Sequence, residues 1–126
     1  MADNPGIAAA RAFVDAFNAQ DHERLAGTLN YPHVRLANNQ YRTVGSAEDF
    51  ATGSRNGESR LRGEGWDHTV LESAEVVHES DDKVHLALVM ARYDKDGKVY
   101  NRFDTFWIAT LENGKWGIRF RSSFLR

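Results

Sequence analysis

The sequence contains no cysteine, which excludes disulfide bonds, thiolate catalysis and metal sites with cysteine ligands. It also lacks any uninterrupted apolar run of about eighteen residues, the length that would suggest a membrane span. Residues 1–5 carry neither the basic segment nor the apolar segment of an export signal. These absences predict a cytoplasmic protein with no membrane partner.

A large excess of one charge is lacking as well, because 16 lysines and arginines nearly balance 18 aspartates and glutamates. A net charge of -2 leaves no electrostatic footprint for a polyphosphate backbone, so we expect no nucleic-acid partner. The five histidines include no pair at metal-ligand spacing on one predicted element, and no phosphate loop or dinucleotide fingerprint occurs. We therefore expect no metal and no cofactor.

What the sequence does contain is enough apolar material for one core. With 126 residues, 41% of them hydrophobic, the chain can bury a single core but is too short for a separate cofactor domain. We therefore predict one domain over residues 1–126, with one site.

Capping residues predict where three N-terminal helices start. Asn4 precedes a proline suited to the first helical position, and apolar residues then recur at helical spacing, which predicts a helix over 5–18. Asp21 can cap a short second helix. Ser46 is predicted to cap a third helix, also short, that begins at Ala47.

Glycine-rich turns and strand-like runs fill the rest of the chain. Over 53–65, four glycines among charged residues predict a solvated loop. Asn113-Gly114 tolerates positive φ at both positions, which predicts a tight hairpin with Glu112 opposite Lys115. Helices first and hairpins last are typical of an α+β fold, here a curved antiparallel sheet (a cone or half-barrel) with the three helices on its concave face. The predicted strands are 33–36, 40–44, 66–78, 83–93, 98–111 and 116–124.

The hairpin turns also predict which residues share a face of the sheet. The predicted pairs are Leu111 with Trp116, Trp107 with Phe120, Asp104 with Ser123, Leu88 with Phe103 and Ala87 with Asp104. One face then carries the bulky residues Leu86, Leu88, Met90, Phe103, Thr105, Trp107, Trp116, Ile118 and Phe120. The other carries His85, Ala87, Val89, Ala91, Arg102, Asp104, Phe106, Ile108, Gly117, Arg119, Arg121 and Ser123. Neither face has the composition of a solvated surface, so we expect a homodimer through the sheet.

Two segments near the ends of the chain form a recognisable pattern. The first, 12–21, is a helix followed by Asn-Ala-x-Asp, and the second is the closing meander with Asn-Gly-Lys-Trp at 113–116. Together they resemble the nuclear transport factor 2-like superfamily, which implies a cone-shaped α+β fold that hosts many functions. Ketosteroid isomerase, one member, uses a tyrosine, an aspartate base and a late-strand acid. These correspond here to Phe13, Leu36 and Asp104, so only the acid is kept.

The resemblance also implies that Asp104 points into the cone, so that its face is the concave one. Composition alone favours the bulky face for the helices, and one β-bulge between Asp104 and Trp116 would reverse the assignment. The expected catalytic residues are Asp104 and Arg121. The expected ligand-binding residues are Arg102, Arg119, His85 and Phe106, with Tyr31, His33, Arg35, Trp66 and His68 as further candidates near the cavity mouth.

These features predict a cofactor-free pocket protein whose partner is a small, mostly apolar molecule with a carbonyl or anionic group. Acid–base chemistry at Asp104 and Arg121 would make it an enzyme. One alternative is a non-enzymatic binding or dimeric assembly module, in which the Asp104 cluster with its arginines is only structural. Another is a lyase or hydrolase with His33 or His68 as the base.

Overall fold

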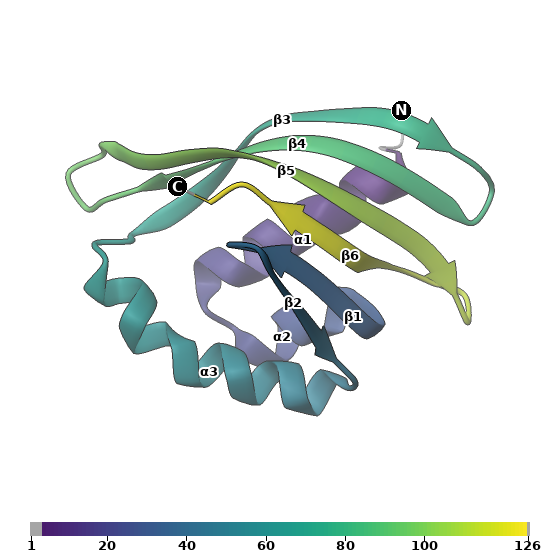
Figure 1. Ribbon diagram of the computed structural model, residues 1–126, viewed down its shortest axis with the longest axis horizontal. Coiled ribbons are helices and arrows are strands. Elements are labelled where there is room, and N and C mark those ends of the chain that lie inside the picture. Colours follow the sequence, from purple (N-terminus) through teal and green to yellow (C-terminus); the bar gives the residue numbers. More distant parts are fainter. Residues whose placement is uncertain (1–3, 126) are drawn as a thin grey trace.

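The computed structural model describes residues 4–125, which form a curved six-stranded sheet with three helices on its concave side (Figure 1). The helices are α1 (Pro5–Ala19), α2 (His22–Gly27) and α3 (Ala47–Gly63). The strands are β1 (Leu29–Ala37), β2 (Gln40–Val44), β3 (His68–Glu79), β4 (Lys83–Tyr93), β5 (Val99–Glu112) and β6 (Lys115–Ser123). They lie in the order β2-β1-β6-β5-β4-β3. This is the α+β architecture that the sequence predicts.

The three helices begin after the predicted capping residues. The side chain of Asn4 accepts a hydrogen bond from the amide of Gly6 at 2.8 Å, at the start of α1. Asp21 and Ser46 cap α2 and α3 in the same way. Gln20, with a left-handed φ of 49°, ends α1. None of the helices within residues 4–125 is long and apolar enough to cross a membrane.

α3 is longer than the sequence predicts. The predicted loop over 53–65 is wrong, because nearly all of that segment is helical. Glycine has a low helix propensity, but contacts with α2 offset it: His22 bonds to Ser54 Oγ and to Glu58 Oε1, both at 2.8 Å. Within α3 only Ala51 is buried, so polar contacts hold this helix more than an apolar stripe does.

β1 begins at Leu29, earlier than the predicted strand 33–36, and the other five strands lie within two residues of their predicted bounds. β1 runs parallel to β6, whereas the other neighbouring strands are antiparallel. Hairpin signals predict antiparallel neighbours only, because a parallel pair needs a long connection. The parallel pairing places Arg35 of β1 directly beside Arg121 of β6.

A β-bulge in the last hairpin changes the predicted register. The pairs near the turn are as predicted, Glu112 with Lys115 and Leu111 with Trp116. Beyond the bulge the pairs are Ile108 with Phe120, Trp107 with Arg121 and Thr105 with Ser123, so the predicted pairs of Trp107 with Phe120 and Asp104 with Ser123 are wrong. The extra residue is Arg119, which has no partner on β5. The bulge therefore moves Arg121 to the opposite face from the one predicted.

The bulky face of the sheet is the concave one, so the assignment taken from the family resemblance is wrong. Leu86, Leu88 and Trp107 are at most 3% exposed and pack in one core with Phe13 of α1. The Phe13 and Trp107 rings meet edge to face with 4.9 Å between centroids. The β4–β5 pairs are shifted by two residues from the prediction, Leu88 with Thr105 and Ala87 with Phe106, which keeps each residue on its face. Packing of the helices buries the larger apolar area, and Asp104 is left exposed on the convex face.

Two glycine substitutions test the helical assignment of α3 and the close packing of β6. A Cβ at Gly57 meets nothing within 4 Å, so Gly57→Ala should raise the free energy of unfolding by about 0.4–1 kcal/mol. A Cβ at Gly117 would lie 2.9 Å from Asn30 Cγ, so Gly117→Ala should lower it by about 1–3 kcal/mol. Urea denaturation measures both. A loss of stability in Gly57→Ala would contradict a helical α3.

Candidate functional site

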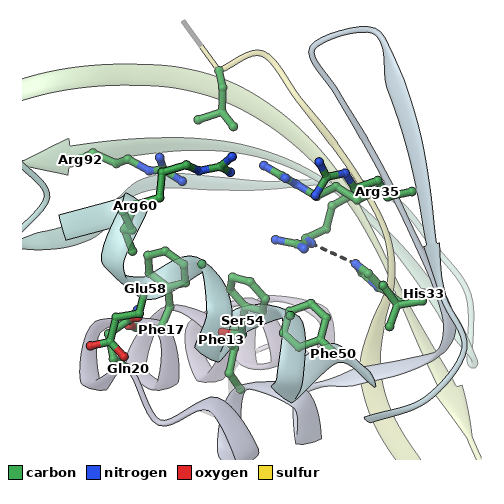
Figure 2. Close-up of a pocket in the computed structure, with 18 of the residues that line it drawn as sticks. Phe13, Phe17, Gln20, His33, Arg35, Phe50, Ser54, Glu58, Arg60 and Arg92 are labelled. Carbon is green, nitrogen blue, oxygen red and sulfur yellow. Dashed lines mark hydrogen bonds between the residues drawn. The ribbon is translucent and has the colours of Figure 1, made fainter. Parts of the chain in front are cut away.

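A cavity of about 880 Å³ lies between the helices and the concave face of the sheet (Figure 2). This volume is within the range of small-molecule sites. One wall is apolar and includes Phe13 and Phe17 of α1 and Phe50 of α3. Another part of the lining is basic and contains Arg35, Arg42, Arg60, Arg92 and Arg121. The cavity therefore offers an apolar body and a cationic side to one ligand.

Three of these arginines form a row across neighbouring strands. Arg42 of β2 is the register partner of Arg35 of β1, and Arg35 is the register partner of Arg121 of β6. We call these residues the arginine row. Register partners share a face of the sheet, and like charges directly opposite each other are destabilising. The row therefore costs folding free energy unless something neutralises it.

Arg121 is held at the inner end of the row by aromatic rings and a histidine. Its guanidinium carbon lies 4.7 Å from the centre of the Phe13 ring and 5.8 Å from that of Trp107. Its Nε donates a hydrogen bond to His33 Nε2 at 3.0 Å, drawn as a dashed line in Figure 2. These contacts fix the position of the guanidinium but do not neutralise its charge.

Neither Arg35 nor Arg121 forms an ion pair with a carboxylate of residues 4–125. The Nε atom of Arg35 is buried and has no hydrogen-bond partner among residues 4–125. A buried donor without a partner costs about 1–3 kcal/mol. An anion bound between these two residues would remove that cost.

The protein environment opposes the charge on both residues. Burial, followed by the nearby Arg35 and Arg92, lowers the pKa of Arg121 to about 9. Burial also lowers the pKa of Arg35, with smaller contributions from Arg92, Arg42 and Arg60. A pKa of about 9 still leaves Arg121 protonated at neutral pH, so the cavity carries the positive charge rather than losing it.

Two acidic residues of the cavity already have cationic partners. Glu64 pairs with Arg92 at 2.8 Å. Glu58 bonds to His22 and to Arg62, and these hydrogen bonds keep the pKa of Glu58 below its usual value. These carboxylates are therefore not available to the arginine row.

His33 is a positioning residue in this geometry. Its side chain is 1% exposed, and its Nδ1 lies 3.0 Å from the backbone oxygen of Ile118. Because Nε2 accepts the bond from Arg121, the proton must be on Nδ1, which donates to Ile118. Burial, and then the charge of Arg121, lowers the pKa of His33 to about 3. With both ring nitrogens engaged, His33 is poorly placed to act as a general base.

The structure separates the residues of the predicted site. Arg121 and His33 line the cavity, but Asp104, Arg102, His85 and Phe106 lie on the convex face. Arg102 pairs there with Glu72 at 2.7 Å, and Arg119 donates to Pro32 O and pairs with Glu112. Tyr31 packs against the core and donates a hydrogen bond to Ala26 O, and Trp66 is buried. His68 forms a hydrogen bond with Asp67 and stacks on Tyr93. The predicted cluster of Asp104 with Arg102 and Arg121 does not form, because the bulge at Arg119 puts Arg121 on the other face.

Sequence reasoning missed Arg42, Arg60 and Arg92. Arg35 was named with His33 as a candidate near the cavity mouth, and both line the cavity, because Arg35 follows His33 by two residues in one strand and therefore shares its face. Arg60 lay in the segment predicted to be a loop. The neighbours of Arg35 could not be predicted, because its pairing with Arg121 is parallel and non-local.

The fold defined by this curved sheet, its covering helices and the cavity between them is an α+β cone. The family described as NTF2-like protein (DUF6841) matches residues 8–121, and the chain therefore belongs to that family. No curated protein matches the chain in sequence.

Solved structures share the fold at low sequence identity. A Nostoc punctiforme protein of unknown function with a cystatin-like fold is similar with a TM-score of 0.76 and 12% identity, over 95% of this chain and 87% of that one. An NTF2-like protein from Novosphingobium aromaticivorans is similar with a TM-score of 0.72 and 16% identity, over 93% and 77%. A ketosteroid isomerase-like protein from Erwinia carotovora atroseptica is similar with a TM-score of 0.69 and 18% identity, over 95% of this chain and 92% of that one. These likenesses establish the fold, and the function must be argued from the site.

The depressed pKa of His33 predicts a specific loss of stability in acid. The unfolded chain binds a proton at this residue below pH 6.5, but the folded chain binds it only near pH 3, so stability is complete above 6.5 and falls toward 3. The contribution is about 1.4 kcal/mol for each pH unit in that window. His33→Gln should have a lower free energy of unfolding than the parent protein, and this difference should shrink as the pH falls. Urea denaturation from about pH 7.5 to about pH 4.5 measures this, and parallel curves would contradict a neutral His33.

Proposed function

We propose that this protein binds a small organic anion with an apolar body. The observation that carries the proposal is the pair Arg35 and Arg121, side by side in an open cavity and without an ion pair to any carboxylate of residues 4–125. Arginine is suited to carboxylate or phosphate oxygens because its planar group donates two parallel hydrogen bonds. An anion there would neutralise charge that the protein leaves exposed to the cavity.

The rest of the cavity suits a ligand whose anionic group is attached to an apolar body. The rings of Phe17 and Phe50 lie across the space from Arg35 and Arg92 (Figure 2), and the Phe13 ring lies under the Arg121 guanidinium. A planar or aliphatic ligand body could cover these rings while its charged end reaches Arg35 and Arg121. This arrangement fits a ligand with separate apolar and anionic ends better than an inorganic ion alone.

The site favours binding over acid–base catalysis. Asp104, the expected acid, is exposed on the convex face, and the ring nitrogens of His33 are both engaged. The arginines can hold an oxyanion, but the cavity carboxylates of Glu58 and Glu64 already have cationic partners. A binding protein is therefore the function that this geometry supports best.

An anion should stabilise the protein, and the neutral analogue should not. We expect 4-phenylbutyrate, at about one hundred times its Kd, to raise the Tm by about 10 °C, and 4-phenylbutyramide to leave it unchanged. Arg35→Met should lose most of this shift and, without ligand, should be more stable by about 1 kcal/mol because a repelling charge is gone. Differential scanning calorimetry measures both quantities.

Arg102→Met is the matched control, since it removes one arginine from the convex face and should keep the full shift. Arg121→Met provides a second test of the pair. An equal Tm shift with the amide, or an unchanged shift in both Arg35→Met and Arg121→Met, would reject this site.

We also propose that the convex face of the sheet packs against a second copy of the chain. Apolar residues cross this face on four neighbouring strands: Val34, Leu36, Val89, Phe106, Ile108 and Phe120. All six are only half-buried in the single chain. The face also carries both signs of charge, with Lys83 and Arg102 beside Glu75 and Asp104, so two copies can face each other without net repulsion.

Light scattering tests the dimer directly. The parent protein should have twice the mass of a single 14.2 kDa chain, and Phe106→Glu should shift it to the single-chain mass by placing a charge at the centre of the interface. Thr52→Glu, at an exposed position of α3 on the other side of the sheet, is the control and should remain dimeric. A parent mass of 14.2 kDa would contradict the proposal.

A further inference from the structure

The positive charge of the cavity extends beyond the pair that holds the first anionic group. Arg42 continues the arginine row outward from Arg35, and Arg60 of α3 lines the same cavity. Among residues 4–125, neither one forms an ion pair with a carboxylate. Figure 2 shows Arg60 and Arg35 on the same side of the cavity, across from the phenylalanine rings.

The described lining has more positive than negative side chains. It contains five arginines and the three carboxylates of Asp49, Glu58 and Glu64, while His33 is neutral. The surplus is therefore two positive charges. Asp49 lies in the first turn of α3, where the helix dipole already favours a negative charge. One monoanion would leave part of this surplus uncompensated.

The helix α3, which lines the same cavity as the arginine row, also leaves room for a second anionic group. Gly53, Gly57 and Gly63 of α3 line the cavity without side chains, and a Cβ at each of them would meet nothing within 4 Å. Space therefore exists next to Arg60 that a larger residue would have filled.

We infer that the ligand is a dianion, with one anionic oxygen pair on Arg35 and Arg121 and the remaining charge toward Arg42 and Arg60. This rests on the proposed function and names its ligand class more closely. Two sources share the chemistry: a dicarboxylate, whose second group reaches the outer arginines, and a phosphate monoester, whose single group carries both charges. The apolar body lies on the rings of Phe17 and Phe50 in either case.

Isothermal titration calorimetry with three probes of similar size tests the inference: benzoate, isophthalate and phenyl phosphate. We expect at least one dianion to bind about tenfold more tightly than benzoate at low salt, a difference of about 1.4 kcal/mol. The advantage should decrease as salt is added, because the outer arginines are exposed. A higher affinity for isophthalate than for phenyl phosphate would indicate that the ligand is a dicarboxylate. The reverse order of affinities would indicate a phosphate monoester.

A double variant assigns the effect to the outer arginines. In Arg42→Gln/Arg60→Gln the affinities for the dianion and for benzoate should converge. The control Arg55→Gln/Arg102→Gln removes the same net charge from exposed positions outside the cavity, where Arg55 pairs with Glu23 and Arg102 with Glu72, and should keep the tenfold advantage.

The failures of the two proposals are distinguishable. If benzoate and both dianions bind the parent protein equally, the dianion inference is overturned and the anion site stands. If none of the three probes binds, both are overturned. If the control double variant loses the advantage as fully as Arg42→Gln/Arg60→Gln does, the effect is general electrostatics and the inference is overturned.

Discussion

The site depends on one local constraint, the β-bulge at Arg119. Without the extra residue, strict alternation along β6 would place Arg121 on the convex face, away from the helices. With it, Arg121 enters the concave side and becomes the neighbour of Arg35 across the parallel β1–β6 pair. Two guanidinium groups thereby share a half-buried position, in which burial lowers the pKa of both and the charge of Arg35 further lowers the pKa of Arg121.

The rest of the fold makes this arrangement tolerable. Part of the concave face is filled by an apolar core in which Phe13 packs against Trp107, and the same two rings lie under the Arg121 guanidinium. His33 accepts the Nε–H bond and, by staying neutral, adds no further charge. The open half of the cone is covered by α3, which α2 holds through polar contacts. Stability thus comes mainly from the apolar core, while the cavity beside it carries the charge.

The sequence predicted the elements well and the site poorly, for physical reasons that can be named. Helix caps such as Asn4 and the Asn113-Gly114 turn are local signals, and they placed most elements correctly. A bulge changes which face a residue occupies through a single extra residue, and no local signal marked Arg119. The apolar composition of the bulky face correctly predicted that this face packs against the helices. The position inside the cone that the resemblance implied for Asp104 was wrong.

A crystal structure of the protein grown with 4-iodobenzoate tests the central claim most directly, because the iodine can be located by its anomalous scattering. The account predicts carboxylate oxygens within about 2.7–3.2 Å of guanidinium nitrogens of Arg35 and Arg121, with the iodine toward Phe17 and Phe50. A ligand bound elsewhere, with both arginines paired to carboxylates of the protein itself, would contradict it.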